Sequence, residues 1–98
     1  MVYAEGRSLV VVGSVGTNAQ VLSDESIHIL GKLSGKAMCG LRGSLSSSIF
    51  CLHFNASFVG VGDASTDCSS NPDLLKLQRA VRVSKNSSDE NTLDFHVF

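Results

Sequence analysis

Histidine is the first residue type to consider for chemistry, because its ring binds metals and moves protons near neutral pH. His28, His53 and His96 lie far apart, and none falls in a His-Glu-x-x-His pattern or another spacing that gathers metal ligands. His28 stands between Ile27 and Ile29, an alternation that places its ring on the solvent side of a strand. We therefore predict no metal site.

The cysteines do not suggest a redox or zinc centre either. Cys39, Cys51 and Cys68 are odd in number, and their spacings fit neither a disulfide framework nor paired zinc ligands. Cys39 and Cys51 fall at strand positions where a small apolar side chain suffices. We predict reduced thiols that serve core packing.

Two further segments resemble catalytic motifs only in composition. Residues 13–18 are rich in glycine but lack the lysine and the following helix that would cradle a phosphate. The serine run 44–48 has no partner base and no Gly-x-Ser-x-Gly elbow. We predict a corner of the chain at 13–18, no enzymatic activity and no cofactor.

The elements that would position a binding site follow from a repeat of about eighteen residues between Leu9 and Val61. The aligned segments are Leu9–Gly13 with Ile27–Gly31, Val15 with Leu33, and Ala19–Val21 with Ala37–Cys39. A third copy, with one residue inserted, places Leu52 after Leu33 and Ala56–Phe58 after Ala37–Cys39.

Each copy has the pattern of short strands, because its apolar runs are β-branched and bounded by Gly, Ser, Asn and Asp. One copy cannot bury its apolar side alone, so stacked copies forming a β-solenoid are predicted. Val15, Leu33 and Leu52 would stack inward, and alanines 19, 37 and 56 would fill a crowded interior corner. The alternative is an antiparallel sandwich with accidental periodicity.

The pattern changes after Val61. Residues 62–71 are small and polar and predict a connecting loop, and Pro72, capped by Asn71, predicts a short helix. Residues 80–84 and 92–98 alternate and predict a hairpin that covers either the solenoid or a second copy. The chain thus divides into a solenoid core at 1–61 and a loop, helix and hairpin at 62–98, within one domain.

Composition narrows the class of partner. Eight Lys plus Arg against nine Asp plus Glu give a net charge of −1, without the basic stripe that nucleic acid requires. The chain has no apolar span long enough for a membrane and no signal peptide, so we expect a soluble, intracellular protein. A short solenoid exposes strand edges at its ends, and self-association would cover them.

Six segments together carry a resemblance to a known family. They are Val2–Gly6, Leu9–Val15, Ala19–Asp24, Ile27–Gly31, Gly35–Gly40 and Ile49–Leu52. Their order and spacing resemble the C-terminal domain of the bacterial septum-site protein MinC, over about residues 2–61. The resemblance implies an all-β fold, a short right-handed triangular β-helix that forms a homodimer through one apolar face. It further implies recruitment to the membrane by the ATPase MinD and inhibition of FtsZ ring assembly.

Departures from the family pattern limit what can be carried over. The MinD-binding motif Arg-Ser-Gly-Gln would stand immediately before Val2, where this chain has Met1, and the family's FtsZ-inhibiting N-terminal domain is missing. The sequence therefore reads as a fragment or a shortened relative. Lys36 replaces an arginine of the family and keeps the charge without the guanidinium fork, and Glu25 replaces a glycine.

The resemblance implies five partner-binding residues: Tyr3, Asp24, Gly35, Lys36 and Gly40. Each has a structural alternative, as a corner glycine, a solvated lysine or a cap on the first coil. The segment from Lys36 to Met38 alone offers a cation beside an apolar side chain, the composition expected for a protein interface.

The hairpin residues Phe95 and Val97 are predicted to form the dimer interface. Two functions stay open: a regulatory module that docks on a MinD-like ATPase, and a purely structural dimerisation scaffold. FtsZ would be reached directly or through the missing domain, and the membrane only through the ATPase. We expect a cytoplasmic location, or the plastid stroma for a chain from a photosynthetic eukaryote.

Overall fold

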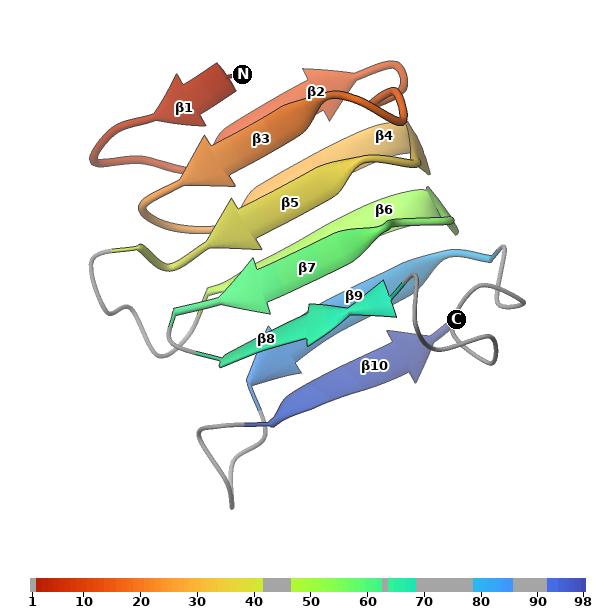
Figure 1. Ribbon diagram of the computed structural model, residues 1–98. Helices are drawn as coiled ribbons and strands as arrows, with labels where there is room; N and C mark the ends of the chain where they lie inside the picture. The colour runs from red at the N-terminus through yellow and green to blue at the C-terminus, as the bar shows by residue number, and fades with distance from the viewer. Residues whose placement is uncertain (1, 42–46, 63, 69–78, 86–91) are drawn as a thin grey trace.

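The computed structural model describes residues 2–41, 47–62, 64–68, 79–85 and 92–98 as strands joined by turns (Figure 1). The strands are β1 (Val2–Ala4), β2 (Leu9–Val12), β3 (Gln20–Ser23), β4 (Ile27–Leu33), β5 (Lys36–Cys39), β6 (Ser48–Phe54), β7 (Phe58–Val61), β8 (Ala64–Asp67), β9 (Val81–Lys85) and β10 (Leu93–Val97). The described chain is thus all-β, as the sequence predicted. Within these ranges no helix has the length and hydropathy to cross a membrane.

The strands form two sheets that face each other (Figure 1). Sheet A has the order β1-β3-β5-β7-β8, and sheet B has the order β10-β9-β6-β4-β2. The first seven strands alternate between the sheets, and each of the first five pairs in parallel with the strand two positions later. The chain therefore winds through successive coils, which contradicts the antiparallel sandwich that the sequence left open.

Three serines at the beginnings of strands of sheet B help to stack the coils. Ser8 and Ser26 immediately precede β2 and β4, and Ser48 is the first residue of β6. The amide N–H of Ser26 donates to Oγ of Ser8 at 3.2 Å, and that of Ser48 donates to Oγ of Ser26 at 3.1 Å. The following inward residues, Ile27 and Ile49, are fully buried. A hydroxyl that satisfies the next coil's amide, followed by a β-branched core residue, explains why these strands begin where they do.

The predicted spacing of eighteen residues between aligned positions is correct for β2 and β4, the first two strands that the chain adds to sheet B. Leu9–Val12 lies beside Ile27–Leu30, and Val15 forms an isolated bridge with Leu33. Between β3 and β5 of sheet A the offset is sixteen, because Val21 pairs with Ala37. Ala19 was therefore wrongly assigned to the interior: it lies exposed at a corner, whereas Ala37 and Ala56 are fully buried.

The third coil was placed in the wrong register. Ile49 pairs with Ile27, an offset of 22, and Phe54 pairs with Leu33. Phe54 is fully buried, while Leu52, predicted to point inward, is 49% exposed. The longer connection between β5 and β6, residues 40–47 against 24–26 between β3 and β4, accounts for the shift.

The C-terminal part both confirms and corrects the expectations. Within the predicted loop 62–71, residues 64–67 are strand β8, which returns antiparallel to β7 through Gly62 with a φ of 61°. Buried Ala64 anchors this strand. The predicted short helix after Asn71 lies outside the described residues.

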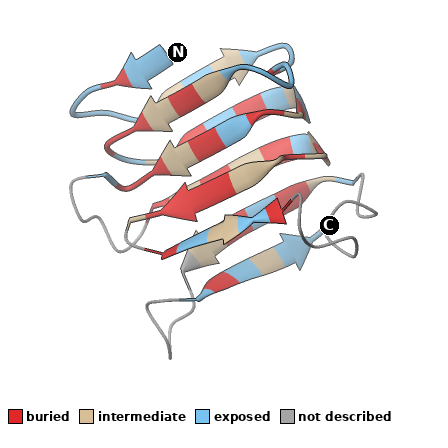
Figure 2. Ribbon diagram, viewed as in Figure 1, coloured by how far each residue is buried: buried red, intermediate tan, exposed pale blue. Residues whose placement is uncertain are grey.

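The predicted hairpin is present as β9 and β10, and β9 also pairs antiparallel with β6, so the hairpin extends sheet B. Val81 and Val83 of β9 are buried. Leu9 and Val11 of β2, at the opposite edge of sheet B, are only half-buried. Figure 2 shows the same asymmetry, with exposed residues on β1 and mostly buried ones on β7. The core is closed toward the hairpin and more open toward the N-terminal coil.

Candidate functional site

The outward side chains of sheet A form a surface that we call face A. It comprises Tyr3, Gln20, Leu22, Lys36, Met38 and Phe58, with Ser65 and Asp67 of β8 at its edge. Successive strands bring these residues into two rows across the sheet, one through Tyr3, Leu22 and Met38, the other through Gln20, Lys36 and Phe58. Because side chains alternate along a strand, Ala37 and Cys39 between them point into the core.

Lys36 is the single Lys or Arg among the described strands of sheet A. It is exposed, and Met38, two residues along the same strand, is half-buried. The Met38 thioether is held by Gln20, whose Nε2 donates to its Sδ at 3.8 Å. Face A thus places one cation beside apolar side chains, the composition expected of a protein interface.

Tyr3 and Asp24, two of the predicted site residues, are in direct contact. The Tyr3 hydroxyl donates to Oδ1 of Asp24, and the Gly6 N–H donates to Oδ2 at 2.6 Å. The Asp24 side chain is only 3% exposed, and its own N–H donates to Ala4 O at 3.2 Å. Asp24 therefore ties the first coil to the second and fixes the Tyr3 ring at the edge of face A.

Gly40 occupies the corresponding corner one coil later. It is buried, its φ of 64° is one that side chains rarely adopt, and its N–H donates to Glu25 O at 2.9 Å. Its backbone conformation alone explains the glycine.

Gly35 lies at the opposite end of β5 and is required by close backbone packing. A Cβ at this position would come closer than 3.0 Å to the carbonyl oxygens of Gly16 and Ala19. The Lys36 N–H donates to Ala19 O at 3.1 Å, and the Ser57 N–H donates to Gly35 O at 3.0 Å. Gly35 thus lets the turn before β3 pack directly on the next coil.

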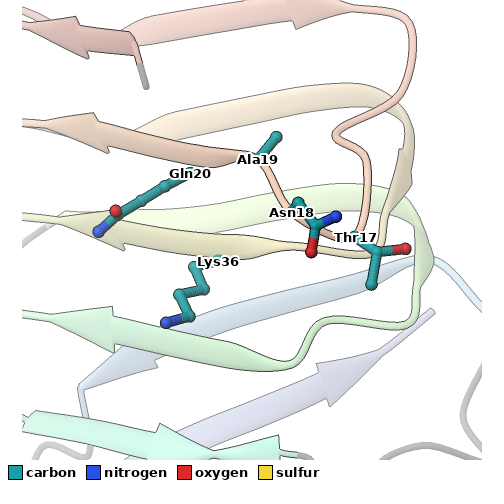
Figure 3. A pocket seen from close by; sticks show the side chains of 5 residues that line it. All are labelled: Thr17, Asn18, Ala19, Gln20 and Lys36. Atoms are coloured by element: carbon teal, nitrogen blue, oxygen red, sulfur yellow. The ribbon is translucent and has the colours of Figure 1, made fainter.

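This packing creates a pocket beside Lys36 (Figure 3). The pocket is lined by Thr17, Asn18, Ala19, Gln20 and Lys36 and has a volume of about 190 Å³. Residues 17–19 belong to the turn before β3, and Figure 3 shows Gln20 and Lys36 extending from neighbouring strands. The sequence did not indicate this pocket, because the repeat placed Ala19 in the interior.

The structure thus separates the five predicted residues into two groups. Asp24 and Gly40 lie where the coils turn from sheet A to sheet B, and Tyr3 of β1 reaches Asp24 with its hydroxyl. Gly35 and Lys36 lie at the other end of β5. Only Tyr3 and Lys36 present exposed side chains, and both do so on face A. Their role in partner binding stays a prediction.

The outward side of sheet B, which we call face B, was missed. It comprises Val10, Val12, His28, Leu30, Phe50, Leu52, Arg82, His96 and Phe98. Val12 is 85% exposed, and Leu30 and Leu52 are each about half exposed. Monomeric surfaces rarely gather so many apolar side chains on a flat sheet. The available signal in the sequence was that most outward positions of β2, β4 and β6 are apolar.

Face B also carries an aromatic cluster around Phe98. Its ring packs edge-on against those of Phe50 and His96, with centroids 5.7 and 4.8 Å apart, and the Arg82 guanidinium lies 5.6 Å from its centroid. Aromatic rings and arginine are the residue types most enriched in protein interfaces.

The two predicted dimer residues differ in their surroundings. Phe95 is half-buried and packs edge-on against core Phe54, with centroids 5.8 Å apart. Val97 is 37% exposed and pairs with Val81. Their part in a dimer stays a prediction, and the larger exposed apolar surface is face B.

The three thiols are buried. Burial raises the pKa of Cys39 to about 12 and those of Cys51 and Cys68 to about 11. They are therefore protonated at neutral pH and poor nucleophiles. Among the described residues, no group of three or more His, Cys, Asp or Glu is placed to hold a metal ion.

Comparison with protein-family models identifies the family of the chain. Residues 1–93 match the family model described as "Septum formation inhibitor MinC, C-terminal domain". The chain is 36% identical over 75 residues to a probable septum site-determining protein MinC of Dichelobacter nodosus, covering 76% of this chain and 31% of that protein. It is 47% identical over 60 residues to one from Bordetella avium, covering 61% of this chain and 22% of the relative. The chain therefore spans less than a third of these relatives' length.

A solved structure agrees with this assignment at the level of fold. A chain of the MinC:MinD cell division protein complex of Aquifex aeolicus superposes with a TM-score of 0.81 at 21% identity, covering 99% of this chain and 76% of that one. The family match extends over nearly the whole sequence and confirms the resemblance drawn from the six segments. The chain belongs to the family of MinC C-terminal domains, the septum formation inhibitors.

Proposed function

We propose that this chain is a non-catalytic module of division-site regulation that docks on a MinD-like ATPase through face A and pairs with a second copy through face B. The observation that carries the docking is the exposed Lys36 beside the apolar row of Tyr3, Leu22 and Met38. It is supported by the fold shared with a chain of a MinC:MinD complex.

Pairing through face B is supported by exposed Val10, Val12, Leu30 and Leu52 on one flat sheet. Burying apolar area contributes roughly 25 cal/mol per Å², so covering these side chains is a substantial driving force. A twofold dimer would leave the two copies of face A pointing outward and free for the ATPase.

The finer features implied by the family belong to the same proposal. A triangular, right-handed coil is supported by the break in the β4–β6 ladder between Ile29 and Lys32 and by the separate bridge of Val15 with Leu33, which together suggest a third, short side. The chain would reach the membrane only through the ATPase, as a cytoplasmic protein, and would contribute to FtsZ inhibition directly or with an N-terminal domain.

The second candidate is a structural dimerisation scaffold. It is favoured by a specific finding: Asp24, Gly35 and Gly40 are each buried and each explained by corner geometry. On this view face B is functional and face A is an ordinary sheet surface.

Co-sedimentation with MinD and phospholipid vesicles, in ATP and in ADP, tests the docking. We expect ATP-dependent recruitment that is lost with Lys36→Glu and with Met38→Glu. The matched control is Lys32→Glu, the same charge reversal at an exposed lysine of β4 outside face A. Recruitment of the control should equal that of the unaltered chain.

Light scattering on the same samples separates the two candidates. A stable dimer that MinD does not recruit in ATP would contradict docking and favour the scaffold. A monomer would contradict pairing through face B, whatever the outcome with MinD.

A further inference from the structure

The pocket beside Lys36 is rigidly built from backbone contacts. The Ala19 N–H donates to Gly16 O at 3.0 Å and closes the turn, and Ala19 O accepts the Lys36 N–H at 3.1 Å. Gly35 allows this turn to approach the next coil more closely than any other residue would. The positions of Thr17 and Asn18 relative to Lys36 are therefore set by the main chain (Figure 3).

The lining of the pocket is rich in hydrogen-bond donors and carries one positive charge. Thr17 offers a hydroxyl, Asn18 and Gln20 offer amides, and Lys36 offers an ammonium group. None of the five lining residues is acidic. Such a lining favours an anionic group that can accept several hydrogen bonds.

The size and place of the pocket indicate which kind of anion fits. Its volume of about 190 Å³ lies below the range of roughly 300–1,000 Å³ typical of small-molecule sites. Two of its lining residues, Gln20 and Lys36, belong to the row of Gln20, Lys36 and Phe58 on face A. A protein docked on face A would cover the residues around the pocket, and one of its side chains would then enter the pocket.

We propose that the pocket receives the carboxylate of one Asp or Glu side chain of the docking ATPase, with Lys36 supplying the charge and Thr17 and Asn18 the hydrogen bonds that select a carboxylate. This inference rests on the proposed docking through face A. It adds the turn 17–19, none of whose residues is among the five predicted site residues, to the binding surface and makes Asn18 a specificity-determining residue.

The test measures the affinity of MinD with ATP for the chain on vesicles, at low and at physiological salt. Asn18→Asp keeps the shape of the side chain and places a negative charge in the pocket, and Lys36→Met removes the positive charge. Each should weaken binding about tenfold or more at low salt, and Lys36→Met should also flatten the salt dependence. Lys32→Met, outside the pocket, is the matched control and should bind like the unaltered chain. Thermal melts check that the exposed substitutions leave the fold intact.

The partner's side of the contact is found by changing each surface Asp or Glu of MinD in turn to Asn or Gln. One such change should weaken binding to the unaltered chain but not to Lys36→Met, because the two substitutions remove the same interaction. Additive effects at every position would overturn the proposal.

The outcomes separate this inference from the proposed function. If the unaltered chain binds and Met38→Glu abolishes binding, but Asn18→Asp and Lys36→Met bind normally, the docking stands and the pocket's role is wrong. If the unaltered chain does not bind MinD, both the docking and the pocket's role are wrong.

Discussion

Replacing Gly35 with alanine tests whether direct contact between the coils holds the docking corner in place. The added Cβ would lie closer than 3.0 Å to two backbone oxygens, those of Gly16 and Ala19, which cannot rotate away as a side chain would. Overpacking of this kind costs about 1–3 kcal/mol, and two collisions place Gly35→Ala near the upper end. The stiffer unfolded chain offsets about 0.4–1 kcal/mol, which leaves a net loss of about 2 kcal/mol.

Urea unfolding followed by circular dichroism measures this loss as a lower midpoint with an unchanged slope. The melting temperature should fall by about 4–8 °C for each kcal/mol in a domain of this size. Gly16→Ala is the matched control, because a Cβ there meets nothing within 4 Å and its φ is not positive. It should leave stability unchanged or slightly raised. Equal stability of the two variants would refute the argument that close coil packing requires Gly35.

Three further predictions follow from burial and register. Phe54→Ala should cost about 3–5 kcal/mol in urea unfolding and Leu52→Ala less than about 1 kcal/mol; similar losses would contradict the observed third-coil register. Because burial raises the pKa of Cys39 to about 12, only unfolded chains ionise this thiol between about pH 9 and 12, so the free energy of unfolding should fall as pH rises through that range, more than in a Cys39→Ala variant. Leu30→Glu should convert dimers to monomers in light scattering, whereas Phe95→Glu should mainly lower the melting temperature because Phe95 packs on Phe54; a persistent Leu30→Glu dimer would exclude face B.

Much of the fold could be predicted because the first two coils of sheet B repeat with a fixed spacing. Leu9–Val12 is an apolar run and Ile27–Leu30 is nearly one, and each is followed by a glycine, so one alignment gives both strands and their pairing. The third coil could not be aligned, because coil length is set by corners that carry no apolar pattern. A search that allowed longer corners would have matched Ile49 to Ile27, since both follow a serine.

The binding surface was less predictable than the core. Lys36 could be predicted from the family resemblance and from the apolar Met38 close by, and the structure places both on one side of β5. The pocket required knowing that β3 and β5 pair at an offset of sixteen residues, which moves Ala19 from the core to the corner beside Lys36. Burial of Asp24 and Gly40 could not be read from composition, because each depends on a hydrogen bond with a residue more than a dozen positions away.

The alternation of single strands links the core to both proposed surfaces. In β4, Ile27 and Ile29 fill the core while His28 and Leu30 form part of face B, and in β5, Ala37 and Cys39 fill the core while Lys36 and Met38 form part of face A. A shift of one residue in either strand would exchange its inward and outward sets and bury a charge. Burying the unpaired Lys36 ammonium would be strongly unfavourable, so the register that builds the core also keeps the cation on the docking surface. Core substitutions that preserve register should therefore leave docking intact even where they lower stability, whereas corner substitutions such as Gly35→Ala should affect both.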